Sequence, residues 1–361
     1  MTLFEDIRWR EVSRGGHTAH VAAATRGIAL ALPLLLVFGG LFVAADAAFE
    51  DLVAGLAPSD AAGLLGHLAL AVLFAWLSVG LLREFVRPAA EALPVRAPRE
   101  RRPLGPVEVG LVLVLVDLLF LAFVLVQLRY LFGGAGRIES EIGLTYAEYA
   151  RRGFFELVIA AALVLPLLLL ADWALRGEER RRALAFQVPA GVLVVLVFVV
   201  MASALERMRL YQDAYGLTEL RVYATGLMVW LAAVLAWAAG TVLRGRRRAF
   251  AAGALAAAFA AVLGLNAVNP DALIARINVE RAVDGRSALD AAYLAELSDD
   301  AVPALVDALP RISPDAQRVI AAELLSRNSG GDWRTWNYAR VRALDAVTGR
   351  RAELDRLAYG P

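Results

Sequence analysis

Residues 107–132 have the sequence VEVGLVLVLVDLLFLAFVLVQLRYLF, and this stretch decides the class of fold. A helix that crosses the hydrocarbon core of a bilayer needs about 20 consecutive, mostly apolar residues. The stretch meets that length, and the acid near its middle, Asp117, is surrounded by Leu, Val and Phe. Residues 107–132 are therefore predicted to span a membrane as a helix.

The same pattern recurs along most of the chain. Of the 361 residues, 59% are hydrophobic and 20% are charged, whereas ordinary soluble domains are about a quarter charged. This composition excludes a disordered chain, a nucleic-acid-binding domain and an ordinary cytosolic enzyme. The predicted spans are 27–49, 61–82, 107–132, 153–175, 186–205, 222–243 and 249–268.

The predicted fold is all-α, a seven-span transmembrane helix bundle with a small external C-terminal helical domain. Residues 1–26 form a cytoplasmic tail, 27–268 the bundle and 269–361 the C-terminal domain. In this last region charged residues return at amphipathic spacing. Asn269, Pro270 and Asp271 place a cap, a proline and an acid in the order favoured at a helix start.

The arginines predict the orientation. All 37 basic residues are arginine; eighteen flank the spans on the side of the N-terminus and seven on the opposite side. The positive-inside rule then places the N-terminus on the cytoplasmic side of a cytoplasmic (inner) membrane. Seven crossings leave the C-terminus outside. A rival interpretation makes the first span a signal peptide cleaved near Ala45-Asp46-Ala47.

Two loops on the sparsely basic side are similar to each other. Residues 143–145 and 216–218 both have the sequence Gly-Leu-Thr, each just before a returning span. Thr145 and Thr218 suit N-cap positions, and the glycines permit sharp turns. The two hairpins are either a parallel repeat of one unit or chance matches between capping sequences.

The sequence contains no recognisable catalytic motif. It has no cysteine, no lysine, no Ser-His-Asp set, no HExxH and no glycine-rich phosphate loop. His17 and His20 lack nearby carboxylates apart from Glu11 and make a weak metal site. No catalytic residue, metal or cofactor is assigned, and the pattern favours a non-enzymatic protein. An enzyme would have to use carboxylates and tyrosines as its acid and base.

A group of polar side chains is predicted near one membrane level, on the side of the C-terminus. They could line a pocket that binds an anionic lipid or solute through arginine forks, with Arg152 the first candidate. The alternative is that tyrosines form an interfacial belt and arginines pair with nearby acids, such as Arg152 with Glu156. The group comprises Arg129, Tyr130, Tyr149, Arg152, Glu156, Arg207, Arg209 and Tyr223.

Asp117 is the deepest ionisable group of the predicted bundle. Charged residues in a membrane are costly and raise a functional question. Asp117 is either a proton or cation site, or it makes a structural hydrogen bond to a neighbouring helix, with His67 as one candidate partner.

Residues 143–157, GLTYAEYARRGFFEL, resemble the signature of a bacterial family of polytopic membrane proteins described as a domain of unknown function (DUF). Three other segments fit the same family: 215–221, Asn269-Pro270-Asp271 with Asn278 and Arg281, and 293–305. The resemblance covers about residues 104–336. It implies a polytopic envelope protein, and it implies no activity, substrate or catalytic residue.

The sequence favours an envelope scaffold or a signalling or assembly partner, which meets the lipid bilayer through its spans and a protein partner through its C-terminal domain. Nucleic acid is not an expected partner. A transporter or channel for a small anionic solute or ions, using the polar pocket and Asp117, is the main alternative. A membrane enzyme is the second.

Overall fold

The computed structural model of the chain describes residues 16–56, 104–131, 153–175, 183–327 and 336–360. The described residues are helical or lie in turns, bends and loops, with no strand among them. The prediction of an all-α chain is confirmed. The predicted span 61–82 and the loop of residues 143–145 lie outside the described residues.

Six described helices are long and apolar enough to cross a membrane. Each overlaps a predicted span, because uninterrupted apolar sequence leaves no polar side chain to end the helix. The six candidate spans are His20–Ala45, Pro106–Leu128, Phe154–Ala174, Ala185–Tyr215, Glu219–Thr241 and Arg247–Val268.

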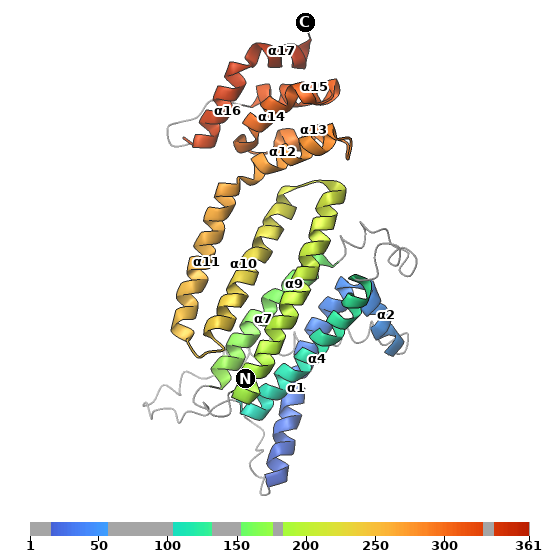
Figure 1. Ribbon diagram of the computed structural model, residues 1–361, viewed down its shortest axis with the longest axis vertical. Helices are drawn as coiled ribbons and strands as arrows, with labels where there is room; N and C mark the ends of the chain where they lie inside the picture. Colours follow the sequence, from blue (N-terminus) through green and yellow to red (C-terminus); the bar gives the residue numbers. More distant parts are fainter. Residues whose placement is uncertain (1–15, 57–103, 132–152, 176–182, 328–335, 361) are drawn as a thin grey trace, which may run out of the picture. The chain divides into compact units, whose positions relative to one another are not determined.

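The chain forms two compact units (Figure 1). The first comprises residues 1–207 and 231–254, and the second comprises residues 208–230 and 255–361. The long helices that enter these units are α1 (Gly16–Ala45), α2 (Ala47–Leu56), α4 (Pro106–Leu131), α7 (Phe154–Ala174), α9 (Val188–Tyr215), α10 (Glu219–Thr241) and α11 (Arg247–Val268), with a π-helical turn η3 (Ala183–Gln187) before α9.

Phenylalanines from α1, α2 and α4 pack together in the core of the first unit. The Phe42 ring stacks on Phe123 with centroids 4.0 Å apart, and it meets Phe120 edge-on at 4.8 Å. Phe38 and Phe49 extend the cluster at 5.2 Å from Phe120 and 5.3 Å from Phe123. Each of these contacts adds aromatic pairing to the area buried between the helices.

The structure divides the predicted 27–49 segment between two helices. α1 ends at Ala45, and the Asp46 carboxylate accepts hydrogen bonds from the backbone N–H groups of Ala48 at 3.0 Å and Phe49 at 3.3 Å. Asp46 therefore caps α2, as acids do at helix starts.

In the second unit the C-terminal helices stack in two layers (Figure 1). In one layer α12 contacts α14 and α14 contacts α16; in the other, α13 contacts α15 and α15 contacts α17. This alternation is the arrangement of an α-solenoid, in which successive helix pairs stack on their neighbours. The helices are α12 (Pro270–Val283), α13 (Ala291–Glu296), α14 (Val302–Ala308), α15 (Pro314–Ser326), α16 (Tyr338–Gly349) and α17 (Arg351–Tyr359), with 3₁₀ turns η4 (Asp299–Ala301) and η5 (Leu309–Arg311).

Side-chain caps begin the principal helices of this solenoid. Asn269 accepts a hydrogen bond from the Ala272 N–H at 3.4 Å, with Pro270 in the first turn, which confirms the cap predicted at this position. Ser313 caps α15 in the same way, through the Ala316 N–H at 3.4 Å. Local sequence therefore determines where α12 and α15 start.

Candidate functional site

The second unit brings together segments that are far apart in the sequence, at a place we call the joint. It consists of the α9–α10 turn, residues 213–221, and the side chains of Asn278, Arg281 and Tyr293 from α12 and α13. The Leu217 N–H donates to Asn278 Oδ1 at 2.8 Å, and Asn278 Nδ2 donates to the Leu217 carbonyl at 2.8 Å. One side-chain amide thus pairs with both backbone groups of a turn residue.

Gly216 makes this close approach possible. Its φ of 77° lies in the left-handed region, where a side chain is disfavoured. A Cβ at this position would lie 2.7 Å from Asn278 Oδ1. The glycine is therefore required twice, for the backbone conformation and for the space that Asn278 occupies.

Two arginines satisfy carbonyl groups at the end of α9. Arg281 Nη2 donates to the Asp213 carbonyl at 2.6 Å, and Arg221 Nη1 donates to the Gly216 carbonyl at 2.6 Å. The Arg221 guanidinium also lies 4.1 Å from the centroid of the Tyr211 ring. The last carbonyls of a helix lack partners within it and carry partial negative charge, so cations stabilise this end.

Tyr293 completes the joint from α13. Its hydroxyl accepts a hydrogen bond from the Glu219 N–H, the first residue of α10, at 3.0 Å. Burial, assisted by the Glu219 and Asp271 carboxylates and opposed by Arg221 and the Glu219 N–H, raises the pKa of Tyr293 above its ordinary value. The hydroxyl therefore stays neutral at physiological pH, as an uncharged link between α13 and α10.

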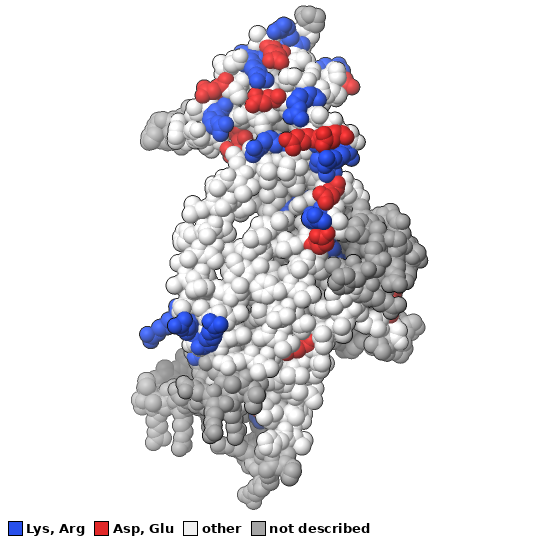
Figure 2. Space-filling model, viewed as in Figure 1, with Lys and Arg blue, Asp and Glu red and all other residues white. Residues whose placement is uncertain are grey.

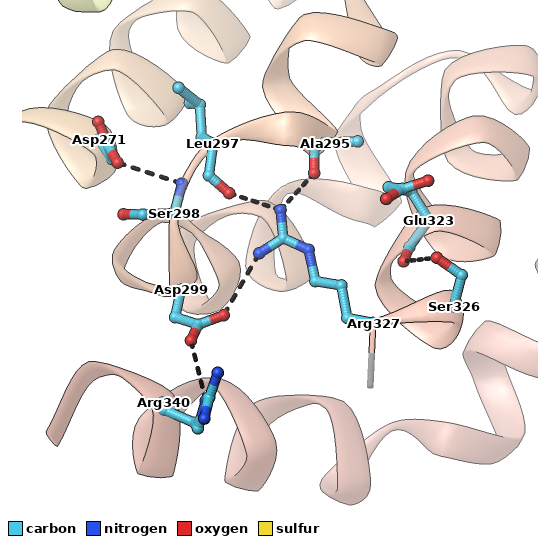
Figure 3. A network of polar contacts seen from close by, with 9 residues as sticks. All are labelled: Asp271, Ala295, Leu297, Ser298, Asp299, Glu323, Ser326, Arg327 and Arg340. Carbon is cyan, nitrogen blue, oxygen red and sulfur yellow. Dashed lines mark hydrogen bonds and ion pairs between the residues drawn. The ribbon is translucent and has the colours of Figure 1, made fainter. Parts of the chain in front are cut away.

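Next to the joint, a network of polar contacts connects the helices of the solenoid (Figure 3). Asp271 Oδ2 accepts from the Ser298 N–H at 3.1 Å. The Arg327 guanidinium donates to the carbonyls of Ala295 and Leu297 and lies 3.5 Å from Asp299 Oδ1. The network therefore joins the start of α12, the end of α13 and the end of α15.

A groove of about 540 Å³ lies beside this network. Apolar side chains from α14, α15 and α16, and from Leu297 after α13, line it together with charged groups. The Glu296 and Glu323 carboxylates have no ion-pair partner among the residues described. The lining residues are Glu296, Leu297, Ser298, Asp299, Val302, Glu323, Leu324, Arg327, Arg340, Ala343, Leu344 and Val347.

The residues of the predicted anion pocket fall in different places. Arg207 is buried in the first unit, where it forms an ion pair with Asp46 and donates to the Ala45 carbonyl at 3.1 Å. Gly153 packs against the same backbone, since a Cβ there would lie 2.0 Å from the Ala45 oxygen. Glu156 is half-buried in the first turn of α7.

The positions of the other residues of the predicted anion pocket do not show whether the pocket exists. Arg209 and Tyr223 are exposed in the second unit. The side chains of Arg129 and Tyr130, in the last turn of α4, lie outside the described part, as do Tyr149 and Arg152. The anion pocket therefore stays a prediction.

Asp117 is buried in α4, with 8% of its surface exposed. Its Oδ1 atom, like both amide atoms of the buried Gln127 on the same helix, has no hydrogen-bond partner within the described ranges. His67, its candidate partner, lies outside them. Within those ranges no cluster of three or more His, Asp or Glu side chains is placed to hold a metal ion.

Two features of the structure had no signal in the sequence. The Asp46–Arg207 pair joins residues 161 positions apart. Asn278 and Tyr293 entered the sequence argument only through a resemblance, since a polar residue on an amphipathic helix is expected to face solvent. The Gly216-Leu217-Thr218 turn did carry a signal: Thr218 directly precedes α10, and its carbonyl accepts from the Val222 N–H at 3.0 Å.

Comparison with known proteins places the chain in a family. Residues 2–308 match the family described as "Domain of unknown function (DUF4153)". This range extends from the N-terminal tail to the end of α14. Neither the curated proteins nor the solved structures contain a match. Because the match covers most of the chain, this polytopic membrane protein belongs to the DUF4153 family of unknown function.

Proposed function

We propose that this protein is a non-enzymatic scaffold or assembly partner of the cell envelope, in which the joint fixes the C-terminal solenoid to the ends of two membrane-spanning helices. In this proposal the bundle has seven spans, the N-terminus is cytoplasmic and the solenoid lies outside the cytoplasmic membrane of a bacterium. The arginine distribution supports this orientation.

The paired hydrogen bonds between Asn278 and Leu217 carry the proposal. A domain that is connected to a membrane-spanning helix by a flexible covalent linker alone stays mobile relative to that helix. Here the side chains of α12 and α13 bind the backbone of a neighbouring turn instead. This arrangement suits a protein that presents a surface in a defined orientation.

The solenoid supplies that surface. Stacked helix pairs expose extended faces on which other proteins bind. The groove combines apolar lining residues with the carboxylates of Glu296 and Glu323, which have no ion-pair partner among the described residues. A partner segment with apolar and basic side chains would match this lining.

Spin-label distance measurements test the rigid attachment. The chain has no cysteine, so Ala214→Cys in α9 and Arg318→Cys in α15, both exposed, give a unique label pair. We expect a narrow distance distribution in the parent protein and a clearly broader one after Asn278→Ala. Asn266→Ala is the matched control, because within the described part of the chain that amide bonds only to the Val262 carbonyl of its own helix, at 2.9 Å. Equal widths in both alanine variants would exclude the joint as the element that fixes the solenoid.

Asp117 favours the second candidate function, a transporter or channel for ions or a small anionic solute. A buried carboxylate oxygen without a described partner suits a site that takes up a proton or cation. Flux of labelled ions into proteoliposomes, with Asp117→Asn as the variant, separates the two functions. If the parent protein transports ions and Asp117→Asn abolishes this transport, the transporter function replaces the scaffold proposal. If neither the parent protein nor Asp117→Asn gives flux, the scaffold proposal is supported.

A further inference from the structure

The turn between α10 and α11 has a defined backbone conformation. The Gly245 N–H donates to the Val242 carbonyl at 2.9 Å, and the Arg246 N–H donates to the Thr241 carbonyl at 2.7 Å. Gly245 has a φ of 75°. These two bonds around a left-handed glycine form a Schellman motif, which ends α10 sharply.

Trp237 fastens the turn to the first helical residues of α11. Its indole Nε1 donates to the Ala249 carbonyl at 3.1 Å. The ring lies against the backbone of Gly253, where a Cβ would be 2.0 Å from the same nitrogen. Tryptophan is enriched where a membrane meets water, because its apolar ring and its N–H group suit both sides of that boundary.

Two further contacts connect the turn to the rest of the first unit. Gln187 Nε2, from η3, donates to the Leu243 carbonyl at 2.8 Å. The Arg247 guanidinium pairs with the buried Asp172 carboxylate and donates to the Asp172 carbonyl at 3.2 Å. The turn is therefore held in place before any ligand arrives.

This anchored turn exposes three further arginines, Arg244, Arg246 and Arg248. None of their guanidinium groups forms a hydrogen bond or an ion pair with any residue that the structure describes, and the Asp172 carboxylate is already engaged by Arg247. Figure 2 shows basic side chains gathered at this turn, and on that face no acidic side chain of the described residues lies beside them. On the solenoid, basic and acidic side chains alternate.

We propose that Arg244, Arg246 and Arg248 form a binding site for the phosphate groups of anionic phospholipids. The turn joins the ends of two candidate spans, so its arginines lie at the level of lipid headgroups when the helices cross a bilayer. Guanidinium groups bind phosphate through paired hydrogen bonds. Each basic residue near an anionic membrane surface also gains electrostatic attraction, and no carboxylate of the described residues is bound to these three arginines to oppose it.

Native mass spectrometry of the full-length protein in a neutral detergent tests the site. The probes are phosphatidylglycerol, which is anionic, and phosphatidylcholine, which is zwitterionic, with identical acyl chains. We expect the parent protein to bind phosphatidylglycerol at least several-fold more tightly than phosphatidylcholine. The triple variant Arg244→Gln/Arg246→Gln/Arg248→Gln is expected to lose about tenfold or more of its phosphatidylglycerol affinity, and its phosphatidylcholine binding is expected to stay unchanged.

The matched control removes the same charge elsewhere. Arg311→Gln/Arg342→Gln/Arg351→Gln changes three exposed arginines of the solenoid and is expected to leave the lipid preference intact. Arg244→Gln alone, which alters only the turn, is expected to lose a few-fold, so the proposal remains testable if the triple variant unfolds. The proposal would be overturned if the two triple variants lost phosphatidylglycerol affinity equally. It would also be overturned if Arg244→Gln and the turn triple variant both kept the parent protein's preference for phosphatidylglycerol over phosphatidylcholine.

A competition experiment distinguishes a lipid ligand from a free anion. Inorganic phosphate at millimolar concentration is expected not to displace phosphatidylglycerol, because the acyl chains hold the headgroup at the turn. Displacement by inorganic phosphate would show that the turn takes a soluble anion and would overturn the assignment to lipid.

Discussion

At the scale of single residues, the joint depends on side chains that replace backbone partners. A buried N–H or C=O group without a hydrogen bond costs about as much as a lost hydrogen bond. Asn278 satisfies both backbone groups of Leu217, and Arg221 and Arg281 satisfy carbonyls at the end of α9. Those contacts specify one arrangement of the turn against α12.

The first prediction compares two glycines that share a left-handed conformation. Gly216 and Gly285 have φ of 77° and 70°, but only at Gly216 would a Cβ meet another atom, Asn278 Oδ1. Gly285→Ala is expected to cost about 1 kcal/mol of stability from the backbone alone. Gly216→Ala is expected to cost about 2–4 kcal/mol, because it also displaces Asn278. Thermal unfolding in detergent measures both, and equal losses would contradict the role assigned to Asn278.

The second prediction concerns the Asp46–Arg207 pair, whose side chains are 1% and 3% exposed. Asp46→Ala breaks this buried ion pair and is therefore expected to cost about 3–5 kcal/mol. The exposed Arg318–Asp315 pair is the control, and Asp315→Ala is expected to cost less than about 1 kcal/mol. Unfolding midpoints give the comparison. A double variant at positions 46 and 207 that is more stable than Asp46→Ala would identify the buried Arg207 charge as the cause.

At the scale of elements, short polar sequences decide where helices begin, and apolar length decides which helices can cross a membrane. Asp46 begins α2, Asn269 begins α12 and Ser313 begins α15. Between such signals the long apolar runs form α4, α7 and α9 without interruption. The Schellman turn after α10 shows the same local control at a helix end.

The third prediction tests one cap within the solenoid. Ser313→Ala removes the acceptor for the Ala316 N–H and is expected to destabilise α15 by about 1 kcal/mol. Hydrogen exchange should accelerate in the first turn of α15. Ser313→Asp is expected to retain the cap, and Ser326→Ala, at the other end of the same helix, serves as the control with no change in that first turn. Unaltered exchange in Ser313→Ala would show that tertiary packing alone holds the helix start.

At the scale of the whole molecule, three helices contribute to both compact units. α9, α10 and α11 each have residues in the first unit and residues in the second. The family match extends from residue 2 to residue 308 and therefore includes both units up to α14. The membrane helices and the first half of the solenoid are thus parts of one region that the family match covers.

The fourth prediction concerns topology. Eighteen arginines on the N-terminal side against seven on the other predict an inside N-terminus and an outside C-terminus. Reporter fusions after Arg102, Arg182 and Arg248 are expected to give a cytoplasmic signal, and a fusion after Pro361 an external one. A cytoplasmic signal after Pro361 would require an even number of spans.

The sequence by itself determined the membrane class, the six described apolar helices and the caps of α12 and α15, because these depend on residues that are neighbours along the chain. Hydrophobic length and capping chemistry act within a few turns of helix. The resemblance through residues 143–157 and three later segments also led to a family of unknown function, which the match over 2–308 confirms at the family level.

Only the tertiary structure decided which distant residues meet. Asp46 and Arg207, Asn278 and Leu217, and Tyr293 and Glu219 are pairs that lie 161, 61 and 74 positions apart. Nothing in the local sequence distinguishes Asn278 from a solvent-facing asparagine, because its hydrogen bonds exist only once α12 packs against the α9–α10 turn. Contacts between distant residues depend on how whole helices pack. A pattern in a single sequence indicates only which face of each helix is apolar and which is polar.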